Sequence, residues 1–128
     1  MGFDHEKLDV YRLSLEFVKW SYGLAKNLQG CDRHARDQLL RASQSIPLNI
    51  AEGNGKKPGA DRARFFQIVY GSALECSAIM DVLLSCEVIS SDQNEIAKKM
   101  LERIVSMLVK LCSYFRGVKE DGTAYETS

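Results

Sequence analysis

The sequence predicts an all-α protein with four helices packed as an antiparallel up-and-down bundle. Apolar residues recur at alternating spacings of three and four along four long segments, which is the period of amphipathic helices. Only two prolines interrupt the chain, and no segment has the alternating pattern of a strand. Short connections between the segments favour helices that alternate in direction. With 128 residues the chain has the usual size of one domain, so we expect a single bundle domain over residues 1–128.

The first helix is expected over about residues 4–28, and it carries two apolar seams. One seam consists of Leu8, Tyr11, Leu15, Val18, Tyr22 and Ala25. The other consists of Val10, Leu13, Phe17, Trp20 and Leu24. The seams are offset by two residues, about 200° around a helix, so one can enter the core while the other needs a partner. The spacing does not determine which seam faces outward; we take the seam that contains Trp20 as the candidate oligomer interface.

The second helix is expected over about residues 32–53. Gly30 ends the preceding helix, and Asp32 has the side chain of a typical N-cap. Pro47 falls inside the helical pattern, where it lacks the N–H group that would donate to the carbonyl of Ser43. We therefore expect a kink at this turn.

The third helix follows the strongest loop signal in the chain. The segment from Gly53 to Gly59 is rich in glycine and contains a proline, and the helix after it is expected over about residues 61–87. Cys76 and Cys86 fall on the apolar seam of this helix. Because free cysteine behaves as a small hydrophobic residue, both are predicted to be buried.

The fourth helix is expected over about residues 91–117. Ser91 has the side chain of an N-cap, and Asp92 places a negative charge in the first turn, where the helix dipole favours it. An apolar seam runs through this helix with the same alternating spacing as in the other three. Residues 118–128 are polar and are expected to form a tail outside the bundle.

Polar residues occupy positions in the second and third helices where the pattern expects apolar ones. Asn49 and Ser72 lie on the seams themselves. The complete polar motif consists of Arg41, Ser45, Asn49, Glu52, Ser72 and Glu75. A buried amide needs a hydrogen-bond partner, so we expect Asn49 to bond to the third helix, with Gly71 allowing the two backbones to approach. We interpret the motif as a structural lock; the alternative is a binding patch formed by Asn49, Glu52 and the glycine-rich loop.

The sequence lacks the motifs that catalysis or metal binding requires. Its histidines, His5 and His34, are not part of a Glu-x-x-His pair, and no Ser-His-Asp, Cys-His or phosphate-loop pattern is present. The four cysteines form no Cys-x-x-Cys pair. We therefore expect no enzymatic activity, no catalytic residue, no metal and no cofactor. The N-terminal segment has no signal peptide or membrane-spanning run, so we expect a cytoplasmic protein that does not contact a membrane.

The net charge is zero, with 17 basic and 17 acidic residues, but the charges are unevenly distributed. Residues 31–64 carry seven basic and four acidic side chains, whereas residues 65–90 carry three acidic side chains and no lysine or arginine. In an antiparallel bundle the loop after the second helix and the start of the third lie at one end. The candidate nucleic-acid-binding residues expected there are Lys56, Lys57, Arg62 and Arg64. Phosphate contacts need only such charges, although a solvated loop is the alternative interpretation.

Three segments of the chain carry a resemblance to a known family. They are the run from Gln38 to Gly53 (QLLRASQSIPLNIAEG), the pair Arg64-Phe65 and the run Gly71-Ser72-Ala73-Leu74-Glu75. Together they resemble the bacterial four-helix-bundle proteins of the 23S rRNA intervening-sequence family, also called S23-like, over roughly residues 8–117. The resemblance implies a homo-oligomeric ring, typically a homopentamer. Distant relatives are accessory proteins that bind nucleic acid and a reverse transcriptase.

Two functions follow as hypotheses. In the first, the protein is a non-enzymatic ring-forming accessory protein that binds nucleic acid (RNA) with its basic end. In the second, it is a protein-binding scaffold or adaptor that makes no nucleic-acid contact. A dedicated nucleic-acid binder is usually more basic than this chain. The family resemblance points to RNA-associated settings, so we prefer the first hypothesis.

Overall fold

A computed structural model describes residues 2–116, and within them the chain folds as four long helices without a strand. The helices are α1 (Asp9–Ala25), α2 (Arg33–Asn54), α3 (Ala60–Ser85) and α4 (Ser91–Arg116). Two short 3-10 helices precede α1 and α2, namely η1 (Asp4–Lys7) and η2 (Gly30–Asp32). The prediction of an all-α protein with four helices is confirmed, and α2, α3 and α4 begin and end within two residues of the expected positions. The tail expected over residues 118–128 lies outside the described residues.

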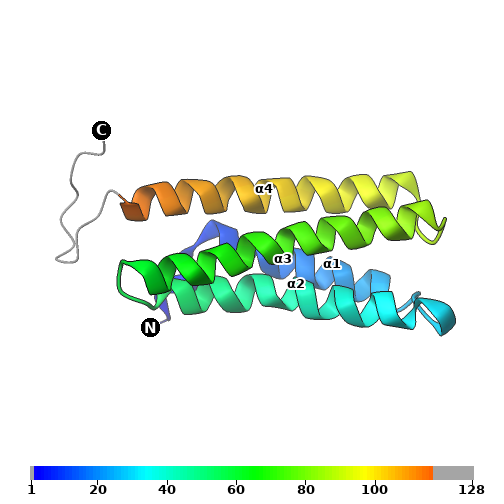
Figure 1. The fold of residues 1–128 in the computed structure, drawn as a ribbon, viewed down its shortest axis with the longest axis horizontal. Coiled ribbons are helices and arrows are strands. Elements are labelled where there is room, and N and C mark those ends of the chain that lie inside the picture. The colour runs from blue at the N-terminus through cyan, green and yellow to red at the C-terminus, as the bar shows by residue number, and fades with distance from the viewer. Residues whose placement is uncertain (1, 117–128) are drawn as a thin grey trace.

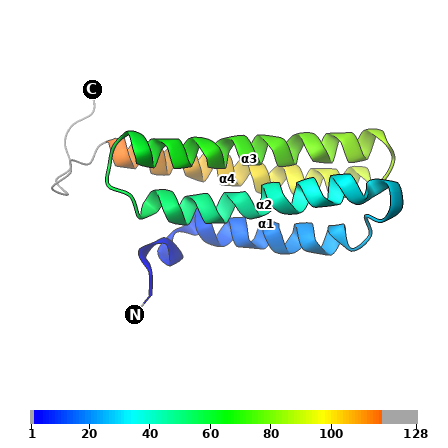
Figure 2. The same cartoon turned by 60° about the horizontal axis from the view of Figure 1, so that its bottom comes forward.

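Successive helices run in opposite directions, as the colour gradient shows in both Figure 1 and Figure 2. In the packed bundle α2 contacts α1 and α3, and α3 contacts α2 and α4. The α2–α3 loop lies at one end, together with the N-terminal segment and the last turn of α4 (Figure 1). The α1–α2 and α3–α4 connections lie at the opposite end. The loop and the start of α3, which hold the candidate nucleic-acid-binding residues, therefore share one end of the molecule.

The N-terminal segment departs from the predicted helix. It begins with the 3-10 turn η1, and Leu8 then has an extended backbone, with φ −80° and ψ 126°. The α-helix therefore starts at Asp9 instead of residue 4. Arg12 holds this arrangement, because its guanidinium donates hydrogen bonds to the carbonyls of Glu6 (3.1 Å) and Lys7 (3.0 Å).

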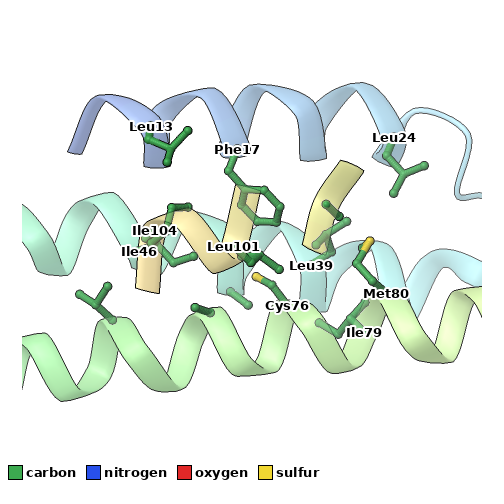
Figure 3. Close-up of a cluster of buried hydrophobic side chains, with 14 of the residues drawn as sticks. Leu13, Phe17, Leu24, Leu39, Ile46, Cys76, Ile79, Met80, Leu101 and Ile104 are labelled. Atoms are coloured by element: carbon green, nitrogen blue, oxygen red, sulfur yellow. The ribbon is translucent and has the colours of Figure 1, made fainter. Parts of the chain in front are cut away.

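The core of the bundle contains the seam of α1 that we expected to face a partner. Val10, Leu13, Phe17 and Leu24 are buried, with Phe17 completely inaccessible, and Trp20 is half-buried. Figure 3 shows Leu13, Phe17 and Leu24 pointing from α1 into the cluster of side chains from the other helices. These residues are covered within a single chain, so the prediction that this seam forms the oligomer interface is wrong.

The tyrosine hydroxyls of the other seam of α1 favour an exposed position. The opposite seam contains Tyr11 and Tyr22, whose hydroxyls need water or a hydrogen-bond partner. Tyr22 is 45% exposed, and its hydroxyl accepts a hydrogen bond of 2.6 Å from Nε2 of Gln44 on α2. Leu15 on the same seam is 44% exposed. The seam without tyrosines therefore enters the core, whereas Leu15 and Tyr22 of the other seam lie at the surface.

Gly53 is the glycine that lets α2 pack against α3. A Cβ atom at this buried position would lie 2.9 Å from the ring of Phe66 and 3.0 Å from Cβ of Phe65. The first distance is shorter than real Cβ contacts, so a larger residue would push the helices apart. Gly71, which we expected to permit the approach, is exposed and has no atom within 4 Å of its Cβ position. That prediction is wrong, because Gly71 faces away from α2.

The two cysteines expected in the core differ in burial. Cys76 is fully buried, and its burial, together with the charge of Glu75, raises the pKa of the thiol to about 12. The thiol therefore stays protonated and unreactive at neutral pH. Cys86 is exposed because it follows Ser85, the last residue of α3, so the prediction that it is buried is wrong.

The start of α4 is closed by a capping box. Oγ of Ser90 accepts a hydrogen bond from the backbone N–H of Gln93 (3.1 Å), and the backbone N–H of Ser90 donates to Oε1 of Gln93 (2.8 Å). This reciprocal pair satisfies two donors that the helix leaves unpaired. Ser90 is thus the N-cap, one residue before the Ser91 that the sequence analysis selected.

The end of α3 is closed by a Schellman motif. The N–H of Val88 donates to the carbonyl of Leu83 (2.9 Å), and the N–H of Glu87 donates to the carbonyl of Leu84 (3.0 Å). This geometry places Glu87 in the left-handed region, with φ 59°. For a residue with a Cβ atom that conformation costs roughly 1–2 kcal/mol, which is why glycine is the usual residue here.

We expect the Glu87→Gly variant to be more stable than the wild type by about 0.5–1 kcal/mol, because glycine adopts the left-handed conformation without steric cost. The gain is smaller than the strain itself, since glycine loses more backbone entropy on folding. Urea unfolding followed by circular dichroism measures the difference. The control is Glu87→Ala, which removes the same side chain but keeps the strain and should leave the midpoint unchanged. Equal midpoints for all three proteins would contradict the strain at this position.

Candidate functional site

Four cations lie near the end of the bundle that contains the α2–α3 loop. Lys56 and Lys57 belong to the loop, while Arg62 and Arg64 lie in the first turns of α3. Gly59 joins the two parts and has φ 144°, a conformation that side chains with a Cβ atom rarely adopt. The structure therefore brings the predicted residues to one end, but it gives them different partners.

Arg62 stabilises the fold. Its Nε donates to the carbonyl of Gly53 and its Nη2 donates to the carbonyl of Asn54, both at 3.2 Å. These are the last carbonyls of α2, where a cation also complements the helix dipole. The guanidinium carbon lies 4.0 Å from the ring centroid of Phe115 on α4. Burial lowers the pKa of this guanidinium, which nevertheless stays protonated. We therefore correct its predicted role: Arg62 joins the ends of three helices, and two of its donors are already used within the chain.

The other three cations remain near the surface around Phe65. Arg64 is exposed, and its Nη2 lies 3.0 Å from Oδ1 of Asp61, which offsets its charge. Its guanidinium carbon is 4.7 Å from the ring centroid of Phe65, and Nζ of Lys56 is 5.5 Å from the same centroid. Lys57 is exposed. The end of the bundle therefore offers three cations, one acid and one aromatic ring to an anionic partner.

The polar motif crosses from α2 to α3 through two serines. Nδ2 of Asn49 donates to the carbonyl (2.7 Å) and to Oγ (2.9 Å) of Ser45 on its own helix. Oγ of Ser72 on α3 donates to the same Ser45 Oγ at 2.8 Å. The expectation that Asn49 bonds directly to α3 is wrong, because Ser45 stands between the amide and Ser72.

The charged members of the motif face solvent. Arg41, Glu52 and Glu75 are exposed, and none of them forms an ion pair with any of the residues that the structure describes. Ser45 and Asn49 are half-buried beside them. Within the motif, therefore, only the serines and the amide form hydrogen bonds, and the three charged side chains face solvent.

The sequence analysis missed a large exposed surface on α3. Ile68, Leu74 and Val82 point away from the core, with exposed fractions of 38% to 58%. Among the residues from 2 to 116, α3 is the helix long and apolar enough to cross a membrane by length and composition, with a mean hydropathy of 1.4. Only 33% of that apolar stretch is buried in the bundle. The signal was present in the sequence, because α3 lacks the charged outer face that a surface helix usually has.

Polar contacts hold α3 inside the bundle on two sides. Ser72 bonds to α2, and Oδ1 of Asp81 lies 2.8 Å from Nζ of Lys98 on α4. The hydrogen bond and charge of Lys98 hold the pKa of the Asp81 carboxyl below its usual value. These contacts fit a helix that packs against protein on two sides and leaves its third side exposed. The absence of membrane contact remains a prediction.

A shallow hollow of about 500 Å³ lies between α1 and α4. Its apolar lining comes mainly from Trp20, Leu24 and Met100, with polar side chains at its margin. Within residues 2–116, no group of three or more His, Cys, Asp or Glu side chains is placed to hold a metal ion. The hollow therefore offers a surface for packing but no arrangement of reactive groups.

Comparisons with known proteins point to one family. Residues 6–110 match a family model described as 23S rRNA-intervening sequence protein. The fold is similar to the crystal structure of a protein with unknown function from the S23 ribosomal protein family of Bacteroides thetaiotaomicron VPI-5482. The two chains are 26% identical, the match covers 80% of this chain and 96% of the other, and the TM-score is 0.73. No curated protein matches this chain.

Replacing Arg62 with methionine should lower the free energy of unfolding by about 1–3 kcal/mol, because the carbonyls at the end of α2 lose a charged donor. Arg64→Met is the matched control. Its exposed ion pair with Asp61 contributes little, so its effect should stay below about 1 kcal/mol. Urea unfolding of both variants provides the comparison. Equal losses would refute the role of Arg62 as the residue that joins the helix ends.

Proposed function

The chain belongs to the 23S rRNA-intervening sequence protein family, and from that premise we propose that it is a non-enzymatic accessory protein that works as a homo-oligomeric ring and contacts RNA. The family resemblance sets the expected number of copies at five. In this proposal the protein needs no cofactor and acts through two surfaces. One joins the copies to each other, and the other is the basic end.

The exposed apolar side of α3 is the observation that carries the proposal. A single chain that exposes Ile68, Leu74 and Val82 on one helix leaves an apolar surface of the kind that marks interaction sites. Only 33% of the apolar stretch of α3 is fully buried in the single chain, and the rest is half-buried or exposed. Association of copies would cover this surface, and the hydrophobic effect would drive that association.

The basic end supports a contact with RNA. Lys56, Lys57 and Arg64 lie at one end of each bundle, and a cyclic assembly would repeat them around one rim. Repetition strengthens the local field, so a chain with no net charge can still attract phosphates at that rim. Because such contacts release counterions, the affinity should fall steeply as the salt concentration rises.

A protein-binding scaffold is the second candidate function. The hydrogen bonds and the ion pair that two of the cations already form within the chain favour this alternative. Arg62 caps α2, and Arg64 pairs with Asp61, so Lys56 and Lys57 carry most of the free positive charge. In this alternative the ring docks another protein and makes no nucleic-acid contact.

Multi-angle light scattering at micromolar concentration should give a mass about five times that of the 14.4 kDa chain. The apolar side of α3 provides the driving force, so the mass should persist when the salt concentration is raised. A clean mass of one chain at this concentration would rule out the proposed assembly.

Fluorescence anisotropy with a structured rRNA fragment and a random DNA of equal length tests the basic end. At about 50 mM salt, where phosphate contacts are strongest, we expect the ring to bind RNA. The Lys56→Glu/Lys57→Glu variant should bind at least about tenfold more weakly, because like charges now face the phosphates. The matched control, Arg33→Glu/Lys99→Glu, makes the same charge change in the opposite half of the bundle, outside the basic end, and should bind as the wild type does. No binding by the wild type at low salt would favour the scaffold.

A further inference from the structure

Two exposed stripes on different helices have the spacing of a coiled-coil contact. The α1 stripe consists of Leu15, Lys19, Tyr22 and Lys26. The α3 stripe consists of Ile68, Gly71, Glu75, Ala78 and Val82. In both stripes the spacing alternates between three and four, so each set lies along one side of its helix. All nine residues are exposed in the single chain.

We propose that the α1 stripe of one copy packs against the α3 stripe of the next copy, in a parallel register that places Lys19 opposite Glu75. The inference rests on the proposed self-assembly and names the surfaces that produce it. The same register places Leu15 opposite Gly71 and Tyr22 opposite Ala78.

Residue size supports this register. Leu15 and Tyr22 are large and lie seven residues apart on α1, while Gly71 and Ala78 are small and lie seven residues apart on α3. Each interval spans about 10.5 Å along its helix. The space around Gly71 is open, with no atom within 4 Å of its Cβ position. The large side chains of α1 in one copy can therefore pack over the small residues of α3 in the next copy, as knobs fill holes in a coiled coil.

Charge supports a second copy of this chain as the partner. Lys19, Lys26 and Glu75 form no ion pair within the part of the chain that the structure describes. The α1 stripe carries only positive charge and the α3 stripe only negative charge. A copy of the chain therefore supplies the charge that each stripe lacks, whereas two identical stripes would bring like charges together. The contact is consequently head to tail.

The two stripes lie on helices that do not contact each other. Among the described residues α1 and α3 each contact α2 and α4, so they occupy opposite corners of the bundle. A head-to-tail contact between the stripes generates a ring when the rotation between neighbouring copies closes, and an open filament when it does not. Because α1 and α3 run in the same direction (Figure 1), a parallel register sets neighbouring bundles side by side with their α2–α3 loops on one rim.

The test uses one variant for each stripe and a mixture of the two. Leu15→Glu disrupts the α1 stripe, and Gly71→Glu disrupts the α3 stripe; both changes suit an exposed helical position. By multi-angle light scattering each variant alone should have the mass of one chain. The equimolar mixture should form a complex of two chains, because one intact α1 stripe meets one intact α3 stripe. Val109→Glu, at an exposed apolar position on α4 outside both stripes, should keep the wild-type mass.

A charge exchange tests the register itself. Lys19→Glu and Glu75→Lys should each weaken the assembly at least about tenfold by placing like charges opposite each other. The double variant should recover the wild-type mass, because the opposite charges meet again. If the double variant remains as weak as the single ones, the proposed register is overturned.

The outcomes separate this inference from the proposal on which it rests. A wild-type ring that persists in both Leu15→Glu and Gly71→Glu overturns the stripe contact and leaves self-assembly intact. Variants that stay monomeric after mixing show that the two stripes do not meet each other, which also overturns it. A wild-type chain that is monomeric and floats with phosphatidylcholine–phosphatidylglycerol vesicles would assign the α3 stripe to a lipid surface, and would overturn both.

Discussion

A four-helix bundle has a single interior, and each helix can turn only one stripe of its surface toward it. Every other feature of this molecule depends on that constraint, because α1 and α3 carry more apolar residues than one stripe can hold. On α1 the tyrosine hydroxyl keeps Tyr22 at the surface while Phe17 is enclosed. On α3 the outer side mixes polar residues such as Tyr70 and Glu75 with aliphatic side chains that remain in contact with water. The surface of this protein is therefore shaped by the residues that its core could not accommodate.

The existence, order and approximate bounds of the helices could be predicted from spacing alone, since each helix repeats its apolar period many times. Orientation could not be predicted, because the two seams of α1 have the same spacing and differ mainly in where their polar atoms can be satisfied. The role of Gly53 was missed for a related reason. A glycine in a sequence shows that space is available, but only the path of the facing helix shows whether Phe66 fills that space.

The basic end illustrates a second limit of sequence reasoning. Arg62 and Arg64 are two residues apart on α3 and look equivalent as charges, yet helical geometry points them in directions that differ by about 200°. One guanidinium reaches the last carbonyls of α2, and the other lies against an exposed aspartate. Counting charges predicted which end of the bundle carries the cations. It did not predict which cations already form hydrogen bonds within the chain, because those bonds go to backbone carbonyls whose positions no sequence pattern reveals.

The two exposed cysteines, Cys31 and Cys86, belong to the connections at the end of the bundle away from the α2–α3 loop (Figure 1). Along a helix of 26 residues the two ends are about 40 Å apart. Maleimide dyes or nitroxide spin labels placed on these thiols would therefore stand well clear of the lysines of the loop. The buried thiol of Cys76, held in its protonated form, would not compete for the reagent. The native chain thus carries its own attachment points for spectroscopy at the end opposite the basic loop.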